Sequence, residues 1–152
     1  MMKLLVKEIK SKAGELHFRR WRLLQLPFFA VYIHGIYKSD GDIHPHSHPW
    51  SFISLILKGS YTEDVWYKDL VFYQFTRKLH YQYPVFKRKT FSIIGHTRQT
   101  YHKIKVTNGP VYTLVFTFGF KKDWGYLVND NFVHYRKYRD LKNLGELYEF
   151  TK

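Results

Sequence analysis

The sequence predicts an all-β protein, a sandwich or barrel that ends in one short helix. Short runs rich in aromatic and β-branched residues recur at a spacing of roughly 8–12 residues, with turn residues between them. Aromatic residues make up 20% of the 152-residue chain, which excludes overall disorder, and the scarcity of Ala and heptad Leu excludes a coiled coil. Only the stretch from Tyr138 to Phe150 has the character of a helix.

The expected strands are apolar runs bounded by turn residues. In chain order they are Leu16–Leu24, Phe28–Tyr37, Ser51–Leu57, Ser60–Tyr67, Leu70–Thr76, Thr90–Gly95, Tyr101–Val106, Val111–Phe118 and Trp124–Val128. Pro27 bends the chain between the first two strands, and Lys58-Gly59 predicts a hairpin between the next two. Further turns are predicted at Ser39–Asp42, Asn108–Pro110 and Asn129–Asn131.

The length suits a single domain spanning residues 1–152, and no linker or internal repeat divides it. The N-terminal charges at Lys3, Lys7 and Glu8 interrupt a signal-peptide core, and no run of ~18 apolar residues exists to span a membrane. Cysteine is absent, which excludes disulfides, thiolate metal sites and a Cys nucleophile. We therefore expect a cytoplasmic protein with no membrane partner.

The chain is strongly basic, with 25 Lys and Arg against 12 Asp and Glu and a formal net charge of +13. This balance favours an anionic small molecule or a nucleic acid as partner, although a basic surface without a specific anion also explains it. Basic residues interleave with aromatic ones, as where Arg19, Arg20 and Arg22 flank Trp21, and this pattern suits phosphate contact and base stacking. Walker, GxGxxG and GxSxG motifs are absent, and no acid pair suits a glycosidase.

Three histidines, His44, His46 and His48, alternate in the segment DIHPHSHPW at residues 42–50. Side chains at i and i+2 of an extended segment share a face, and the two prolines of this segment favour extension. Neighbouring histidines can share one metal ion, but three on one strand span about 13 Å. A third ligand must then come from elsewhere, with His80, His96, His102 and His134 as candidates.

The segment from His46 to Gly59 resembles the first motif of the cupin superfamily, G(x5)HxH(x3–4)E(x6)G. His46 and His48 take the HxH positions, Gly59 takes the final Gly, and Phe52 stands where the family has Glu. The resemblance implies a double-stranded β-helix, or jelly-roll (cupin) barrel, whose metal site is the three-His variant found in thiol dioxygenase-like members.

The whole chain is similar to small cupin-like proteins of phage and bacterial genomes, and a homodimer paired through strands at the barrel edge is implied as well. The pieces that carry this similarity are RWRLL at 20–24, HSHPW at 46–50, LKGSYTE at 57–63, HKI at 102–104 and WGY at 124–126.

In this resemblance His102 takes the position of the second-motif histidine, because a strand, a turn and another strand follow it. The family's Pro and Gly before that histidine, and Asn after it, are not found here. His96 is an alternative to His102, and His44 is an alternative ligand or a donor that orients His46 or His48. We expect Glu63 to lie too far from the metal to bind it, as a surface or substrate-rim residue.

The expected cofactor is one divalent transition metal, with Fe(II) favoured and Zn, Ni or Mn possible for imidazole ligands. Three neutral imidazoles leave the charge of the metal uncompensated, which favours an anionic substrate, water or dioxygen at its open positions. The candidate substrate-binding residues are Tyr32 and His34, which share a strand face, and the cationic Arg22 and Lys103.

Three functions stay open at this point. The first is a metal-dependent enzyme, an Fe(II) oxygenase in its sharpest form, that acts on an anionic small molecule or nucleotide. The second is a non-catalytic module that binds a phosphorylated ligand or nucleic acid. The third is a metal-independent sugar-nucleotide isomerase or epimerase in which a histidine is the general base.

Overall fold

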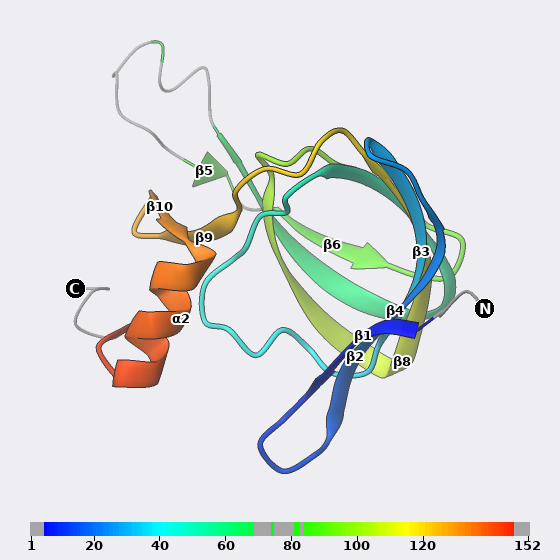
Figure 1. The fold of residues 1–152 in the computed structure, drawn as a ribbon, viewed down its shortest axis with the longest axis horizontal. Coiled ribbons are helices and arrows are strands. Elements are labelled where there is room, and N and C mark those ends of the chain that lie inside the picture. The colour runs from blue at the N-terminus through cyan, green and yellow to red at the C-terminus, as the bar shows by residue number, and fades with distance from the viewer. Residues whose placement is uncertain (1–4, 69–73, 75–80, 83, 148–152) are drawn as a thin grey trace.

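The computed structural model describes residues 5–68, 74, 81–82 and 84–147, and Figure 1 shows strands that curve around a common interior with one helix beside them. The all-β class with a short C-terminal helix is confirmed. The elements are β1 (Leu5–Lys10), β2 (Leu16–Gln25), β3 (Phe29–Ile36), β4 (Ser51–Lys68), β5 (Tyr81–Gln82), β6 (Val85–Arg88), β7 (Ile93–His96), β8 (Tyr101–Phe118), β9 (Gly125–Val128), β10 (Asn131–His134) and α2 (Tyr135–Leu144).

The main sheet is antiparallel, with the order β1-β2-β3-β8-β4-β5, and β6 and β7 also pair with β4. Strands β4 and β8 form the long central pair of this sheet, which extends from Ser51 opposite Phe118 to Trp66 opposite Tyr101. One half of this long pair continues into β3, β2 and β1, and the other half carries β6. The two strands therefore connect both sides of the barrel (Figure 1).

The predicted hairpin at Lys58-Gly59 is wrong, because the chain continues through these residues as one strand, β4. The pairing with β8 instead shifts register between Ile56 and Tyr61, which is the mark of a bulged strand. A slip of one residue exchanges the two faces of a strand. Ser54 and Ile56 are buried before the bulge, whereas Tyr61, Glu63 and Val65 are buried after it.

Gly59 makes this bulge possible, since its φ is +89° and a Cβ there would lie 2.8 Å from the carbonyl oxygen of Pro110. We predict that Gly59→Ala lowers the free energy of unfolding by about 1–3 kcal/mol, measured by urea denaturation. Gly95→Ala is the matched control, because a Cβ at this strand glycine meets nothing within 4 Å. Equal losses in the two variants would contradict this account of the bulge.

The structure confirms some of the remaining sequence predictions and contradicts others. The predicted turn at Asn108–Pro110 is wrong, because β8 runs through these residues. The predicted turn at Asn129–Asn131 is confirmed by the positive φ of Asn129 and Asp130 between β9 and β10. The helix begins at Tyr135 rather than Tyr138, and its predicted end at Phe150 lies outside the described residues. The strand predicted at 70–76 also falls almost wholly outside them, and β1, β5, β6 and β10 were not predicted.

The helix α2 packs against the β9–β10 hairpin through a small core of its own. Val128, Val133, Tyr138 and Leu147 form this cluster, and the rings of Tyr126 and Tyr138 stack at 3.7 Å between centroids. The hairpin in turn bonds to the segment between β3 and β4, since Ser47 N–H donates to the Gly125 carbonyl. Helix and hairpin thus support the histidine-containing segment from one side (Figure 1).

Within the part of the chain that the structure describes, no helix combines the length and apolar character needed to cross a membrane.

Candidate metal centre

The histidine segment is not the extended strand that its prolines predict. Residues 43–50 are irregular apart from an isolated bridge at His46, which exchanges backbone hydrogen bonds of 3.0 and 2.9 Å with His102 on β8. Leu127 N–H also donates to the Pro45 carbonyl at 3.0 Å. The segment is therefore held between β8 and β9, and backbone bonding sets His46 beside His102.

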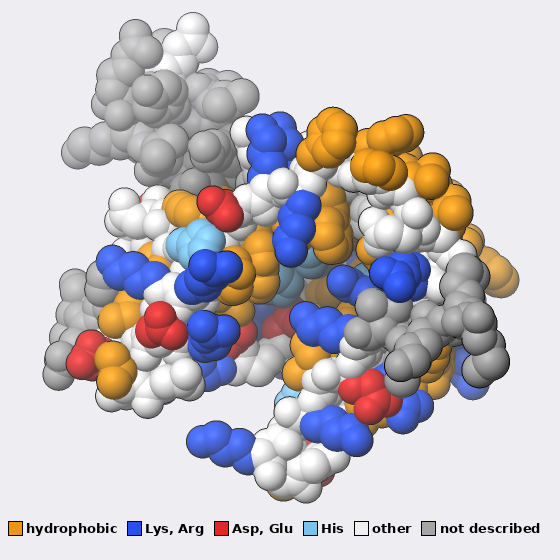
Figure 2. All heavy atoms as spheres, viewed as in Figure 1, with side chains coloured by type: hydrophobic (Ala, Val, Ile, Leu, Met, Phe, Trp, Pro, Cys, Tyr) orange, Lys and Arg blue, Asp and Glu red, His pale blue; other side chains and the backbone are white. Residues whose placement is uncertain are grey.

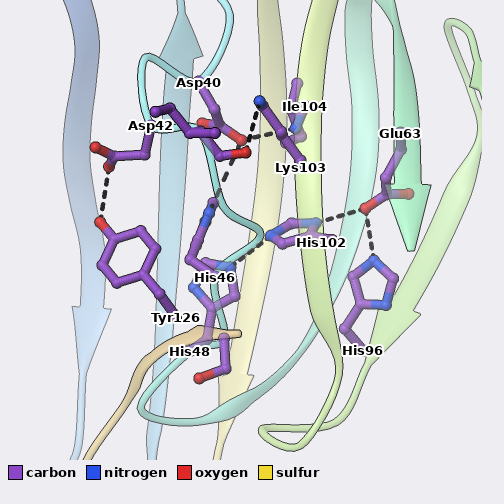
Figure 3. A network of polar contacts seen from close by, with 12 residues as sticks. Asp40, Asp42, His46, His48, Glu63, His96, His102, Lys103, Ile104 and Tyr126 are labelled. Carbon is purple, nitrogen blue, oxygen red and sulfur yellow. Dashed lines mark hydrogen bonds and ion pairs between the residues drawn. The ribbon is translucent and has the colours of Figure 1, made fainter. Parts of the chain in front are cut away.

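His46, His48 and His102, which we call the three-His cluster, converge as the sequence predicts, with ligand atoms within 4.8 Å of one another (Figure 3). The ring centroids of His46 and His48 lie 5.1 Å apart, and each lies 4.9 Å from that of His102. The Nε2 atoms of His48 and His102 are 2.7 Å apart. Two nitrogens bound to one metal would stand about 3.0–3.4 Å apart. The rings of His48 and His102 therefore need to move only slightly apart to accommodate an ion.

Burial keeps this cluster in the form that binds metals. It lowers the pKa of His46 to about 4, an effect that Asp40 partly opposes, and it lowers the pKa of His48 well below its usual range. Both imidazoles are consequently neutral near pH 7. A neutral imidazole offers the lone pair that a transition metal requires.

Glu63 is not a surface residue, which corrects the first of its two expected placements. Its carboxylate is fully buried and accepts hydrogen bonds from His102 Nδ1 and His96 Nε2, both at 2.6 Å (Figure 3). It also accepts a hydrogen bond from Arg88 Nε at 2.8 Å. Burial alone would raise the pKa of Glu63, but the hydrogen bonds from His102 and His96 outweigh it and hold that pKa far below its usual value. The bulge in β4 explains the error, because it turns Glu63 inward.

The Glu63 carboxylate determines which nitrogen of His102 is free. Because the ionised carboxylate only accepts, His102 donates its Nδ1 proton to Glu63, and its Nε2 faces His48. A carboxylate in this position fixes ring orientation and raises ligand basicity at histidine metal sites. Phe52, which stands where the cupin motif has Glu, packs its ring 4.9 Å from that of His48. The carboxylate of this site therefore comes from Glu63, and it bonds to Nδ1 of His102.

The two alternative ligands do not join the three-His cluster. His44 Nδ1 lies 3.0 Å from the Tyr138 hydroxyl, so its ring turns toward α2. His96 contacts the same Glu63 oxygen as His102, and Glu63, His96 and His102 form a second set of close ligand atoms. That set fits an ion less well, because Arg88 already neutralises the carboxylate and His96 is not part of the cavity wall.

The three-His cluster opens on a cavity of about 440 Å³ inside the barrel. Figure 2 shows the mouth of this hollow, with histidine inside it and Lys and Arg side chains around it. Of the four predicted substrate contacts, only His34 lines the wall. Tyr32 donates to Gln25, Lys103 donates to the Ile43 carbonyl, and Arg22 is outside the lining. The wall holds instead Arg20, which sequence reasoning placed in a basic cluster without assigning it a role, and Lys7 and Lys121.

Two aspartates fix the segment that carries His46. Asp40 accepts from Ile104 N–H at 2.7 Å and lies 3.9 Å from His46 Nδ1 (Figure 3). Asp42 accepts from the Tyr126 hydroxyl at 2.8 Å and from Lys142 of α2 at 2.6 Å. These contacts tie the segment to β8, β9 and α2 at once.

His34 predicts how stability depends on pH. Burial lowers its pKa well below the usual range, and the charges of Arg20 and Lys7 lower it further. Its stabilising contribution is present above the unfolded pKa near 6.5 and is lost as pH falls toward the folded pKa, because only the unfolded chain takes up the proton. Between pH 6.5 and 5 we expect the unfolding free energy of His34→Gln to fall less steeply than that of wild type, by up to about 1.4 kcal/mol per pH unit. Identical slopes in urea-unfolding series would contradict this.

Comparisons with known proteins show the fold. No family model matches the chain, and no curated protein matches it. The structure of Fe(II)-HppE with the alternative substrate (S)-1-HPP aligns with a TM-score of 0.54 and 10% identity, over 78% of this chain and 58% of that chain. Hydroxypropylphosphonic acid epoxidase from S. wedmorenis aligns with a TM-score of 0.53 and the same identity and coverage. The chain therefore spans 58% of the length of each of these neighbours.

The protein has the jelly-roll barrel fold that its sequence predicts, with a short C-terminal helix. Inside this barrel lies a candidate metal site of three histidines, one of which is hydrogen-bonded to Glu63.

Proposed function

We propose that this protein is a mononuclear metal-dependent enzyme in which the three-His cluster holds one divalent transition metal. The observation that carries the proposal is the convergence of three imidazoles within 4.8 Å on the wall of a substrate-sized cavity. Imidazole sets of this kind bind Fe(II), Zn, Ni or Mn. Fe(II) is favoured because the fold neighbours include Fe(II)-HppE, and its dioxygen chemistry suits an oxygenase.

The metal would supply Lewis-acid or redox chemistry at positions left open by three protein ligands. The residues of this chain would prepare the site for it. Glu63 holds the proton of His102 on Nδ1, which keeps Nε2 available. Phe52, Trp50 and Val115 give the cavity apolar surface that strengthens electrostatic interactions by excluding water. Cationic side chains on the same wall favour an anionic small molecule as substrate.

The proposal is tested by loading the protein anaerobically with Fe(II) and measuring oxygen uptake with sets of small phosphorylated and carboxylated compounds. We expect uptake with at least one anionic compound and none in His102→Ala or after replacement of Fe(II) by Zn(II). Turnover that persists after exhaustive chelation would instead support a metal-independent isomerase. Salt-sensitive binding of these anions without turnover under any metal would support a non-catalytic module.

A further inference from the structure

Three cations on the cavity wall have no acidic partner among the described residues. They are Lys7 on β1, Arg20 on β2 and Lys121 in the segment between β8 and β9, and we call them the cation cluster. Loss of surrounding water lowers the pKa of Lys7, and the positive charges of Arg20 and Lys121 lower it further. Lys7 pairs with Arg20 across the β1–β2 register, and both line the same cavity as Lys121, so Lys7 is close enough to feel the charge of each. Lys38, on the same wall, differs because it pairs with Glu15 at 3.8 Å.

The three carboxylates that line the same cavity already have other hydrogen-bond and ion-pair partners. Asp40 binds the Ile104 amide, Asp42 binds Lys142 and Tyr126, and Glu63 is surrounded by Arg88 and two histidines. None of these carboxylates forms an ion pair with the cation cluster. The cavity thus holds an uncompensated positive region on a wall shared with the three-His cluster.

Arg20 is built into this wall rather than extended into solvent. Its Nε donates to His34 Nε2 at 2.9 Å, and its guanidinium carbon lies 4.9 Å from the Tyr32 ring centroid and 5.6 Å from that of Trp50. These contacts hold the guanidinium half-buried, and its Nη hydrogens have no acceptor in the described part of the chain. An oriented guanidinium with free donors is suited to a planar or tetrahedral oxyanion.

We propose that the cation cluster binds the phosphate group of a small phosphate monoester whose apolar or planar body extends along Trp50 toward the three-His cluster. Three unpaired cations match a group that carries about −1.5 to −2 charges at pH 7 better than they match a carboxylate. The role of this subsite in positioning a substrate rests on the proposed function. Its anion binding does not, because the cations belong to the protein fold.

Phenyl phosphate is a suitable probe, because it joins a dianion to a planar body. Calorimetric titration at fixed low salt should detect its binding both in metal-loaded and in chelator-treated protein. Lys121→Gln and Arg20→Gln should each weaken binding roughly 10-fold or more, as expected for loss of a charged hydrogen-bond donor. Phenol, which lacks the phosphate, should show no comparable binding.

Lys105→Gln is the matched control, because it removes the same charge from an exposed position of β8 outside the cavity. Lys121 is exposed in a connecting segment, so its variant tests the proposal even where Arg20→Gln fails to fold. Equal affinity in wild type and Lys121→Gln, or an equal loss in Lys105→Gln, would overturn the subsite. Failure of wild type to bind phenyl phosphate would do the same.

Metal content measured on the same samples separates this proposal from the proposed function. Protein that takes up no metal but binds phenyl phosphate through Lys121 would retain the subsite and refute the metal centre. Protein that takes up metal, with phenyl phosphate affinity unaffected by Lys121→Gln, would retain the metal centre and refute the subsite.

Discussion

Replacement of His102 by alanine is expected to lower the affinity for a divalent transition metal by more than about 100-fold. Loss of a partner that merely orients a ligand costs roughly 10–100-fold, and loss of the ligand itself costs more. Among the three proposed ligands, His102 is expected to matter most, because its ring lies 4.9 Å from those of both other histidines and it is the one bonded to Glu63. Competition with a chromophoric chelator measures the change.

His44→Ala is the control for this experiment, because His44 belongs to the same segment and turns away toward Tyr138. We expect its metal affinity to stay within a few fold of wild type. The three-His assignment fails where His44→Ala loses metal as completely as His102→Ala, or where His102→Ala keeps its full affinity.

Glu63→Gln is expected to lower the unfolding free energy of the metal-free protein by about 3–5 kcal/mol. The Glu63 side chain is 1% exposed and that of Arg88 is 19% exposed, so the substitution leaves a largely buried guanidinium without its counter-charge. The new amide nitrogen also faces donors rather than acceptors. In protein that still folds, metal affinity should fall roughly 10–100-fold, because His102 loses the charged acceptor that holds its Nδ1 proton.

Asp64→Asn provides the comparison, because Asp64 is the next residue on β4 and lies on the opposite strand face. Its unfolding free energy should change by no more than about 0.5 kcal/mol. Combining Glu63→Gln with Arg88→Gln should cost less than the sum of the single changes, since the two side chains form one ion pair. Additive costs would show that the pair is not the source of the stability.

The fold class and much of the candidate site are visible in the sequence. Aromatic and β-branched runs predict strands, and the alternation of His46 and His48 predicts that two imidazoles meet, because these are local properties. The choice of His102 depended on the order of strands, and the structure brings it beside His46 through a pair of backbone hydrogen bonds. No pattern within the segment itself indicates that pairing.

Glu63 shows where sequence reasoning fails. Lys58-Gly59 has the composition of a tight turn, and only the pairing with β8 converts it into a bulge. The register shifts of this bulge decide whether Glu63 faces solvent or the interior. The cation cluster was equally hidden, since Lys7, Arg20 and Lys121 come from three separate segments and meet only through tertiary structure. The only signal in the sequence is the position of Arg20, a basic residue within a predicted strand.

Elemental analysis of protein purified without a histidine tag tests the central claim most directly. The account predicts near-stoichiometric transition metal per chain, bound as isolated or after anaerobic loading with Fe(II). Absence of bound metal after loading with Fe(II), Mn(II), Ni(II) and Zn(II) would contradict it, and the convergence of His46, His48 and His102 would then require another explanation.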